Sequence, residues 1–134
     1  MNFAYLIDSD WAIDHLNGIV PVVERIAEFE SAGLGVSIIS VAELYEGVIY
    51  SRHPDKSEKA LTEFLSGVAV LGLDEGIARI FGQERGRLRQ SGQMIGDFDL
   101  LIAATARYYQ VPICSNNRSH FDRIEGLTVI STSG

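Results

Sequence analysis

The sequence Ala4-Tyr-Leu-Ile-Asp8-Ser-Asp10 is a short apolar run that stops at two acidic residues. The same arrangement recurs along the chain: Glu43 follows the run at 36–39, Asp99 opens the apolar segment 100–106, and Asn117 follows the run at 111–114. Consecutive strands of a parallel sheet end at the same edge, so side chains placed in this way are expected to converge on one crevice. Carboxylates that gather there repel one another unless a cation lies between them, and Mg²⁺ prefers oxygen ligands.

The composition is that of an ordinary globular protein. The chain has 134 residues, of which 46% are apolar and 22% charged, so residues 1–134 are expected to form a single domain. No apolar run reaches the roughly 20 residues of a membrane helix, and the acidic N-terminal segment does not resemble a signal peptide. The only cysteine, Cys114, cannot form an internal disulfide. We therefore expect a reducing, cytoplasmic location and no membrane association.

The net charge of −7 argues against a generic nucleic-acid-binding surface, which is normally basic. The arginines are nevertheless concentrated in one segment, at positions 79, 85, 87 and 89. Two interpretations of this segment remain open. It can form a track for RNA, or it can be a solvated helix face whose arginines pair with Glu84 and Asp74.

The hydrophobic periodicity predicts strands that alternate with helices. Strands are expected at residues 4–7, 36–39, 68–71, 111–114 and 127–130. Helices are expected at 9–16, 22–31 and 40–50, from a cap at Asp55 to 66, from a cap at Asp74 to about Gly92, from 97 or 98 to 109, and at 118–121. This order predicts an α/β fold, a three-layer sandwich with a mostly parallel central sheet flanked by helices.

The acidic residues that follow the first two strands each have a simple structural explanation. Asp8 can be the N-cap of the next helix, although Ser9 or Asp10 would serve equally well. Ser40-Val-Ala-Glu43 matches a capping box, in which the glutamate returns a hydrogen bond to the cap backbone. A helix that starts at the carboxyl edge of a sheet faces the same crevice, so a cap and a ligand role for Glu43 are compatible.

The polar residues later in the chain also have structural explanations. Of Asp97 and Asp99, one is expected to cap the helix and the other to lie in its first turn, and Asp99 is the preferred metal ligand because the most apolar helix follows it. Asn116 and Asn117 are common turn-formers that can also hold metal-bound water or a phosphate oxygen. The three histidines share no metal-ligand spacing and are assigned to the surface or to loops. They are His15, His53 and His120.

Four segments together resemble the successive motifs of PIN-domain ribonucleases, and in particular VapC-type toxins of VapBC toxin–antitoxin pairs. They are Tyr5-Leu-Ile-Asp8-Ser, Ser37-Ile-Ile-Ser-Val-Ala-Glu43-Leu-Tyr-Glu-Gly47, Ile95-Gly-Asp-Phe-Asp99-Leu-Leu-Ile-Ala-Ala-Thr-Ala106 and Ser115-Asn-Asn117-Arg-Ser-His-Phe121. The resemblance covers nearly the whole chain in order. It implies a PIN-like fold and a metal-dependent endoribonuclease that cleaves RNA phosphodiesters.

The resemblance also implies roles for individual residues. Asp8, Glu43 and Asp99 correspond to the acidic metal ligands for Mg²⁺ or Mn²⁺, and Asp97 and Asn117 complete the catalytic set. Asn117 stands at a position that is often aspartate in the family, which bears on whether one or two metals bind. Ser9 and Ser115 keep hydroxyls where the family usually has threonine, and with Asn116 they are expected to support substrate or metal-bound water. An inhibitory antitoxin and a homodimer formed through apolar helix faces are implied as well, with the first two helices and the Arg-rich segment as candidate surfaces.

Two other functions compete with this interpretation. A degenerate nuclease domain could act as a binding module, with Asn117 marking lost catalysis. Asp8-Ser-Asp10 after a first strand also resembles haloacid-dehalogenase-like phosphatases. That chemistry requires a lysine near the phosphate, whereas the only lysines, Lys56 and Lys59, lie on a helix that the pattern predicts to be exposed. The sequence indicates neither the RNA target nor the identity of the antitoxin.

Overall fold

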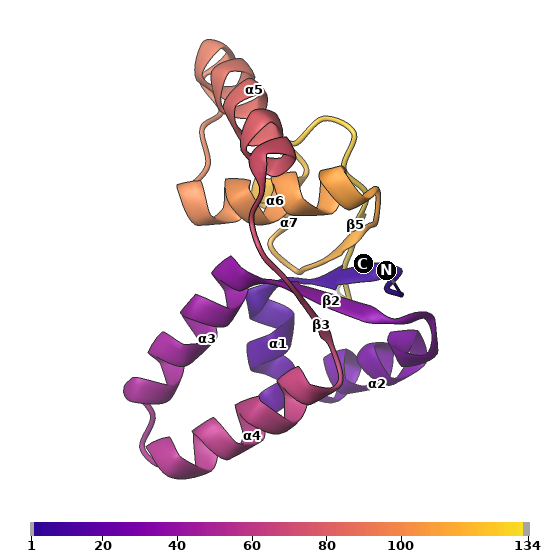
Figure 1. Ribbon diagram of the computed structural model, residues 1–134, viewed down its shortest axis with the longest axis vertical. Helices are drawn as coiled ribbons and strands as arrows, with labels where there is room; N and C mark the ends of the chain where they lie inside the picture. The colour runs from indigo at the N-terminus through magenta and orange to yellow at the C-terminus, as the bar shows by residue number, and fades with distance from the viewer. Residues whose placement is uncertain (1, 133–134) are drawn as a thin grey trace.

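The centre of the protein is a sheet of short parallel strands, as the computed structural model, which describes residues 2–132, shows in Figure 1. Within that range the strands are β1 (Tyr5–Ile7), β2 (Leu34–Ser37), β3 (Ala69–Leu71), β4 (Ile113–Cys114) and β5 (Val129–Ile130). Their order is β3-β2-β1-β4-β5, and every neighbouring pair is parallel. The predicted parallel sheet is therefore confirmed.

Helices cover both faces of this sheet, which gives the three layers expected (Figure 1). One group consists of α1 (Ser9–Leu16), α2 (Val20–Phe29) with a 3₁₀ turn at Glu30–Ala32, α3 (Ile38–Ile49) and α4 (Pro54–Ser66). The other consists of α5 (Glu75–Ser91), α6 (Asp97–Tyr109) and α7 (Arg118–Phe121). None of these helices combines the length and the apolar character that crossing a membrane would demand.

Each face of the sheet has its own hydrophobic core, and the strands supply side chains to both. In β1, Ile7 packs with Trp11 and the α1–α4 layer, whereas Leu6 packs with the α5–α7 layer. In β4, Cys114 and Ile113 divide in the same way. Successive strand residues point to opposite faces, so a run that is buried on both faces is apolar at every position. This explains the continuous apolar runs of the sequence.

The strand order creates a crevice at the carboxyl edge of the sheet. After β1 the chain builds β2 and β3 on one side, and it then crosses over to place β4 and β5 on the other side. The loops after β1 and β4 consequently leave in different directions, and such a switch point is where open parallel sheets bind ligands. Asp8 follows β1 and Ser115 follows β4, so both lie at this point.

The start of α3 differs from the prediction. Strand β2 ends at Ser37, whose side chain caps the helix by accepting a hydrogen bond of 3.1 Å from the backbone of Ile39. Ser40 is buried inside the helix, and Glu43 lies in the second turn, so the capping box proposed from sequence is wrong. The β-branched pair Ile38-Ile39 favours a strand locally, but tertiary pairing of β2 stops at Ser37.

Other helix starts correct or confirm single residues. The N-cap of α4 is His53 rather than Asp55, and the N-cap of α6 is Gly96, so neither Asp97 nor Asp99 is a cap. Asp74 caps α5 through a 3.0 Å hydrogen bond from Ile77, as predicted. Gly92 ends that helix with a φ of 70°, a left-handed conformation that glycine adopts without strain.

The Arg-rich segment lies on α5, and two of its arginines, Arg85 and Arg87, form intramolecular ion pairs. Glu84 is only 5% exposed and accepts hydrogen bonds from Arg107 at 2.7 Å and Arg87 at 2.8 Å. Arg87 also donates to the carbonyl of Arg123 at 2.6 Å, and Arg85 pairs with Asp97. These contacts join α5 to α6 and to the segment after α7. The expected pairing with Glu84 is confirmed, but Glu84 is buried rather than solvated, and Asp74 serves as a helix cap.

We predict that Glu84→Gln lowers the free energy of unfolding by about 2 kcal/mol, because two arginines lose their common carboxylate. The loss stays below that of a fully buried pair since the side chains of Arg107 and Arg87 are 30% and 37% exposed. Chemical denaturation measures the change. The exposed Glu58→Gln on α4 is the control, with an expected change within about 0.5 kcal/mol. Equal effects of the two substitutions would contradict a structural role for Glu84.

Candidate active site

Asp8 is the buried centre of the site. It occupies the N-cap position of α1, yet its side chain makes no capping hydrogen bond. Its Oδ2 instead accepts a 2.7 Å hydrogen bond from Oγ of Ser115, directly after β4. Asp8 is 4% exposed and Ser115 is fully buried. The capping explanation for Asp8 is therefore wrong, and its carboxylate joins the ends of two neighbouring strands.

The surroundings of Asp8 disfavour its negative charge. Burial, and after it the adjacent charge of Asp10, together raise the pKa of its carboxyl to about 8. Hydrogen bonds from Ser115 and from the backbone of Ser9 favour the ionised form but are outweighed. A buried acid of this kind, at a ligand-binding edge, is what a cation would stabilise in its charged form.

Asp10 fixes the loop that follows β4, a role the sequence interpretation missed. Its Oδ2 accepts hydrogen bonds from the backbone of Asn116 at 2.9 Å and from Oγ of Ser115 at 3.4 Å. The side chain of Asn116 accepts from Nε1 of Trp11 at 3.2 Å and donates to Thr132 at 2.9 Å. The side chain of Asn116 thus anchors the loop to Trp11 and Thr132, and its hydrogen bonds within residues 2–132 do not reach Asp8, Glu43 or Asp99. In the sequence, the spacing Asp8-x-Asp10 is the feature that indicates this role for Asp10.

Asn117 and His120 meet Asp99 from the other side of the crevice. Nδ2 of Asn117 lies 3.3 Å and Nδ1 of His120 lies 2.7 Å from the same Asp99 oxygen, Oδ2. The backbone of Asn117 also donates to Oγ of Ser115 at 3.0 Å. A continuous chain of hydrogen bonds therefore runs from Asp8 through Ser115 and Asn117 to Asp99. His120 was assigned to the surface or a loop from sequence, and its place one helical turn after Asn117 was the signal overlooked.

Glu43 belongs to a second hydrogen-bonded group. Oγ of Ser9 donates to its Oε1 at 2.6 Å, and the residues are 34 positions apart in the sequence. Since the capping box is absent, this contact is what orients the glutamate. Ser9 directly follows Asp8, so the peptide between them connects the two groups. The side chain of Asp97 is 59% exposed and pairs with Arg85 of α5.

The predicted residues thus reach one edge of the sheet without forming a closed metal cage. Across residues 2–132, no three histidine, cysteine, aspartate or glutamate side chains are gathered closely enough to hold a metal on their own. In Glu43 and Asp99 the protein hydrogen bonds within that range use one carboxylate oxygen each, Oε1 and Oδ2. The donor set is oxygen-rich and anionic, which suits a hard cation that keeps several waters, as Mg²⁺ does.

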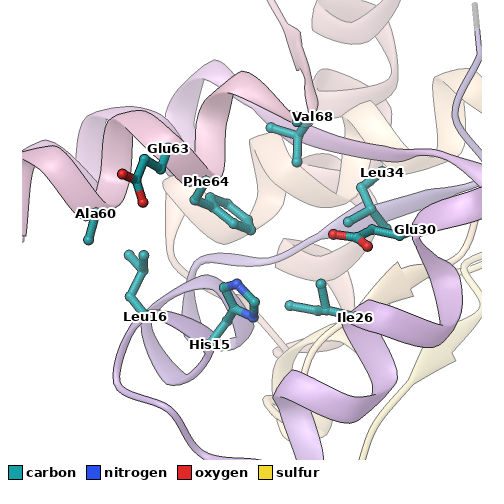
Figure 2. Close-up of a pocket in the computed structure, with 10 residues that line it drawn as sticks. His15, Leu16, Ile26, Glu30, Leu34, Ala60, Glu63, Phe64 and Val68 are labelled. Atoms are coloured by element: carbon teal, nitrogen blue, oxygen red, sulfur yellow. The ribbon is translucent and has the colours of Figure 1, made fainter.

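Two cavities flank the helical layer made by α1–α4. A groove of about 430 Å³ starts at Glu43 and runs between α1, α3 and α4, with an apolar lining that includes Leu16, Leu44 and Val48. A separate cavity of about 350 Å³ lies among His15, Glu30, Glu63 and apolar neighbours, as Figure 2 shows. It includes Leu34, the first residue of β2, so it lies at the amino end of that strand, away from the site.

Comparison with known proteins identifies the family to which this fold belongs. The family model of the PIN domain matches residues 5–127. The Haemophilus influenzae protein "Ribonuclease VapC2" is 37% identical over 107 residues, which cover 78% of this chain and 81% of the relative. The Shigella flexneri "tRNA(fMet)-specific endonuclease VapC" is 28% identical over 123 residues, 92% of this chain and 93% of the relative.

A solved structure supports the same assignment. The VapBC2 complex of Rickettsia felis, crystallised with a DNA fragment from its promoter, contains a chain that superposes with a TM-score of 0.89 at 26% identity. The superposition covers 95% of this chain and 97% of the other. The resemblance seen in the sequence motifs is confirmed: the chain belongs to the PIN-domain family, among the VapC ribonucleases.

Proposed function

We propose that this protein is a metal-dependent endoribonuclease and the toxin component of a toxin–antitoxin pair. The observation that carries the proposal is the chain of hydrogen bonds from Asp8 through Ser115 and Asn117 to Asp99 across the switch point of the sheet. It brings carboxylates from distant segments to one edge. The names of the relatives, ribonucleases and a tRNA endonuclease, support RNA as the substrate.

Mg²⁺ or Mn²⁺ would be held by Asp8 and Asp99, with Glu43 as a third ligand or as the residue that orients the attacking water. When bound, such a cation lowers the pKa of water and stabilises the charge that develops on the scissile phosphate. Ser115 and Asn117 hold the carboxylates of Asp8 and Asp99 in place, and Ser9 holds that of Glu43. Asn117 is neutral, so the protein supplies less negative charge here than an aspartate would, and a second cation is disfavoured.

The groove beside Glu43 is the surface that we propose for the antitoxin. Its lining combines apolar side chains such as Leu16 and Val48 with polar ones that include Glu43 and Lys56, and it lies on a chain with a net charge of −7. A partner segment with apolar side chains and a basic residue near Glu43 would match both its lining and its charge. Solved structures that resemble this chain include VapBC complexes, which is consistent with such a partner.

We infer that residues 1–134 act as a single PIN-like domain in the cytoplasm and form a homodimer. The first two helices, named as candidates from sequence, expose Ile13 and Val20. A third apolar face, on α3, exposes Ile38, Tyr45 and Ile49 at positions that share one side of the helix. The Arg-rich helix is a weaker candidate, because Arg87 is engaged by Glu84.

The nuclease proposal predicts that Asp8→Asn and Asp99→Asn each reduce RNA cleavage by at least roughly 100-fold, because each removes a metal ligand. Cleavage of tRNA(fMet) and of mixed structured RNA would be measured with Mg²⁺, with Mn²⁺ and with EDTA. Asp55→Asn, on the exposed start of α4, is the charge-matched control. Wild-type cleavage by Asp8→Asn or in EDTA would end the proposal. RNA binding without cleavage would favour a binding module, and phosphomonoester turnover a phosphatase.

Asp8 should also make the metal-free protein less stable as pH rises. Its pKa is near the ordinary aspartate value of 3.8 in the unfolded chain and about 8 in the fold, so the folded state binds the proton more tightly. Stability from this residue is present below pH 4 and is lost as pH rises towards 8. In EDTA, Asp8→Asn should therefore raise Tm by several degrees at pH 8 and by little at pH 4.5. Mg²⁺ should stabilise the wild type more than the variant. A pH-independent difference would contradict this account.

Blocking the groove should release the nuclease from its inhibitor. A Cβ at Gly47 would meet no heavy atom within 4 Å, so Gly47→Trp is expected to fold and to fill the groove. With the antitoxin coexpressed, we expect copurification to fall at least roughly tenfold while RNA cleavage by the free protein is retained. Gly82→Trp, an equally open position on α5, is the control. Undiminished copurification of Gly47→Trp would place the antitoxin elsewhere.

A further inference from the structure

His120 contacts Asp99, and the mechanism proposed above assigns no role to this contact. Its Nδ1 lies 2.7 Å from Oδ2 of Asp99, and the side chain of His120 is 39% exposed while that of Asp99 is 24% exposed. Asp99 is thereby held by two residues of one turn, His120 and Asn117.

The chemistry of the contact assigns its proton. An ionised carboxylate oxygen can only accept, so at 2.7 Å Nδ1 carries the hydrogen and donates it to Asp99. Nδ2 of Asn117, which is 3.1 Å from Nδ1 and 3.3 Å from Oδ2, is then a second donor to the same oxygen rather than a partner of the ring. Both bonds converge on Oδ2 and leave Oδ1 of Asp99 available to a ligand.

The helix that carries His120 is firmly placed. Phe121, the next residue, is fully buried in the core of the α5–α7 layer. On the other side, Nη1 of Arg118 donates to the carbonyl of Val129 in β5 at 3.2 Å. The imidazole is therefore held by the core and the sheet, and its position does not depend on Asp99 alone.

We propose that His120 is a positioning residue, which fixes the carboxylate of Asp99 and thereby sets the affinity of the site for its divalent cation. The inference rests on the proposed function, since it assigns Asp99 to the cation. Hydrogen bonds to a ligand from outside the coordination sphere typically contribute about 10–100-fold in metal affinity. Removal of the bond should cost affinity for the cation, while the chemistry at saturating cation persists.

Two substitutions separate the ring nitrogens. Nδ2 of asparagine is as many bonds from Cα as Nδ1 of histidine, whereas Nε2 of glutamine corresponds to Nε2 of the ring. His120→Asn should therefore keep the bond to Asp99, and His120→Gln and His120→Ala should lose it. Asp122→Asn is the control on the same segment, because Asp122 is exposed and its one ion pair within residues 2–132 is with Arg118 at 3.3 Å.

The test measures Mn²⁺ binding directly, by the electron paramagnetic resonance signal of free Mn²⁺ in the absence of RNA, and cleavage as a function of Mn²⁺ concentration. We expect His120→Ala and His120→Gln to raise the Kd for Mn²⁺ about tenfold, with kcat at saturating Mn²⁺ within a few-fold of wild type. His120→Asn and Asp122→Asn should bind Mn²⁺ as wild type does.

The outcomes separate this inference from the nuclease proposal. A wild-type Kd for His120→Ala, or rescue by glutamine but not by asparagine, overturns the positioning role. After such a result, loss of Mn²⁺ binding by Asp99→Asn in the same assay would show that the metal site stands and that only the inference about His120 has failed. If the wild-type protein binds no Mn²⁺, the metal site itself is wrong. Thermal unfolding of each variant shows whether the fold is kept, and the comparison of asparagine with glutamine still decides if alanine does not fold.

Discussion

The hydrogen bond between Ser115 and Asp8 is the contact on which the site depends. It buries a carboxylate at the point where the chain leaves β1 in one direction and enters β4 from the other. Burial and the neighbouring Asp10 raise the pKa of that carboxyl to about 8, so the arrangement is costly without a counter-charge. Ionisation of this buried carboxyl is therefore unfavourable in free energy, and a cation bound at the carboxyl edge of the sheet would offset that penalty.

The contacts around Asp8 extend this constraint to residues far apart in sequence. Asp10 and Asn116 tie the loop after β4 to α1, and the loop in turn presents Asn117 to Asp99. In the same way, the hydroxyl of Ser9 orients the carboxylate of Glu43. Each carboxylate is therefore oriented by a hydroxyl or amide from another segment. Preorganisation of this kind limits how far the acids can move apart when they repel one another.

The helical layers on the two faces of the sheet have different roles. The α5–α7 layer anchors the residues that hold Asp99, through the buried Phe121 and the Glu84 pair that joins α5 to α6. The α1–α4 layer carries Glu43 and the apolar groove beside it. The proposed nuclease centre and the surface proposed for its inhibitor thus share one residue, Glu43. A partner bound in the groove would lie next to the catalytic edge.

The sequence by itself determined the alternation of strands and helices, the parallel sheet and the acids at the strand ends, because burial on both faces leaves continuous apolar runs. Local rules fail where a side chain has a choice of partner. The sequence pattern favours Ser40 as a cap, although pairing of β2 ends at Ser37, and it allows Asp8 as a cap, although its side chain bonds Ser115. Only the tertiary structure decided these contacts and brought His120 to Asp99. The partner of His120 lies 21 positions away and that of Asp8 lies 107 positions away, and hydrogen bonds over such separations leave no periodic trace in the chain.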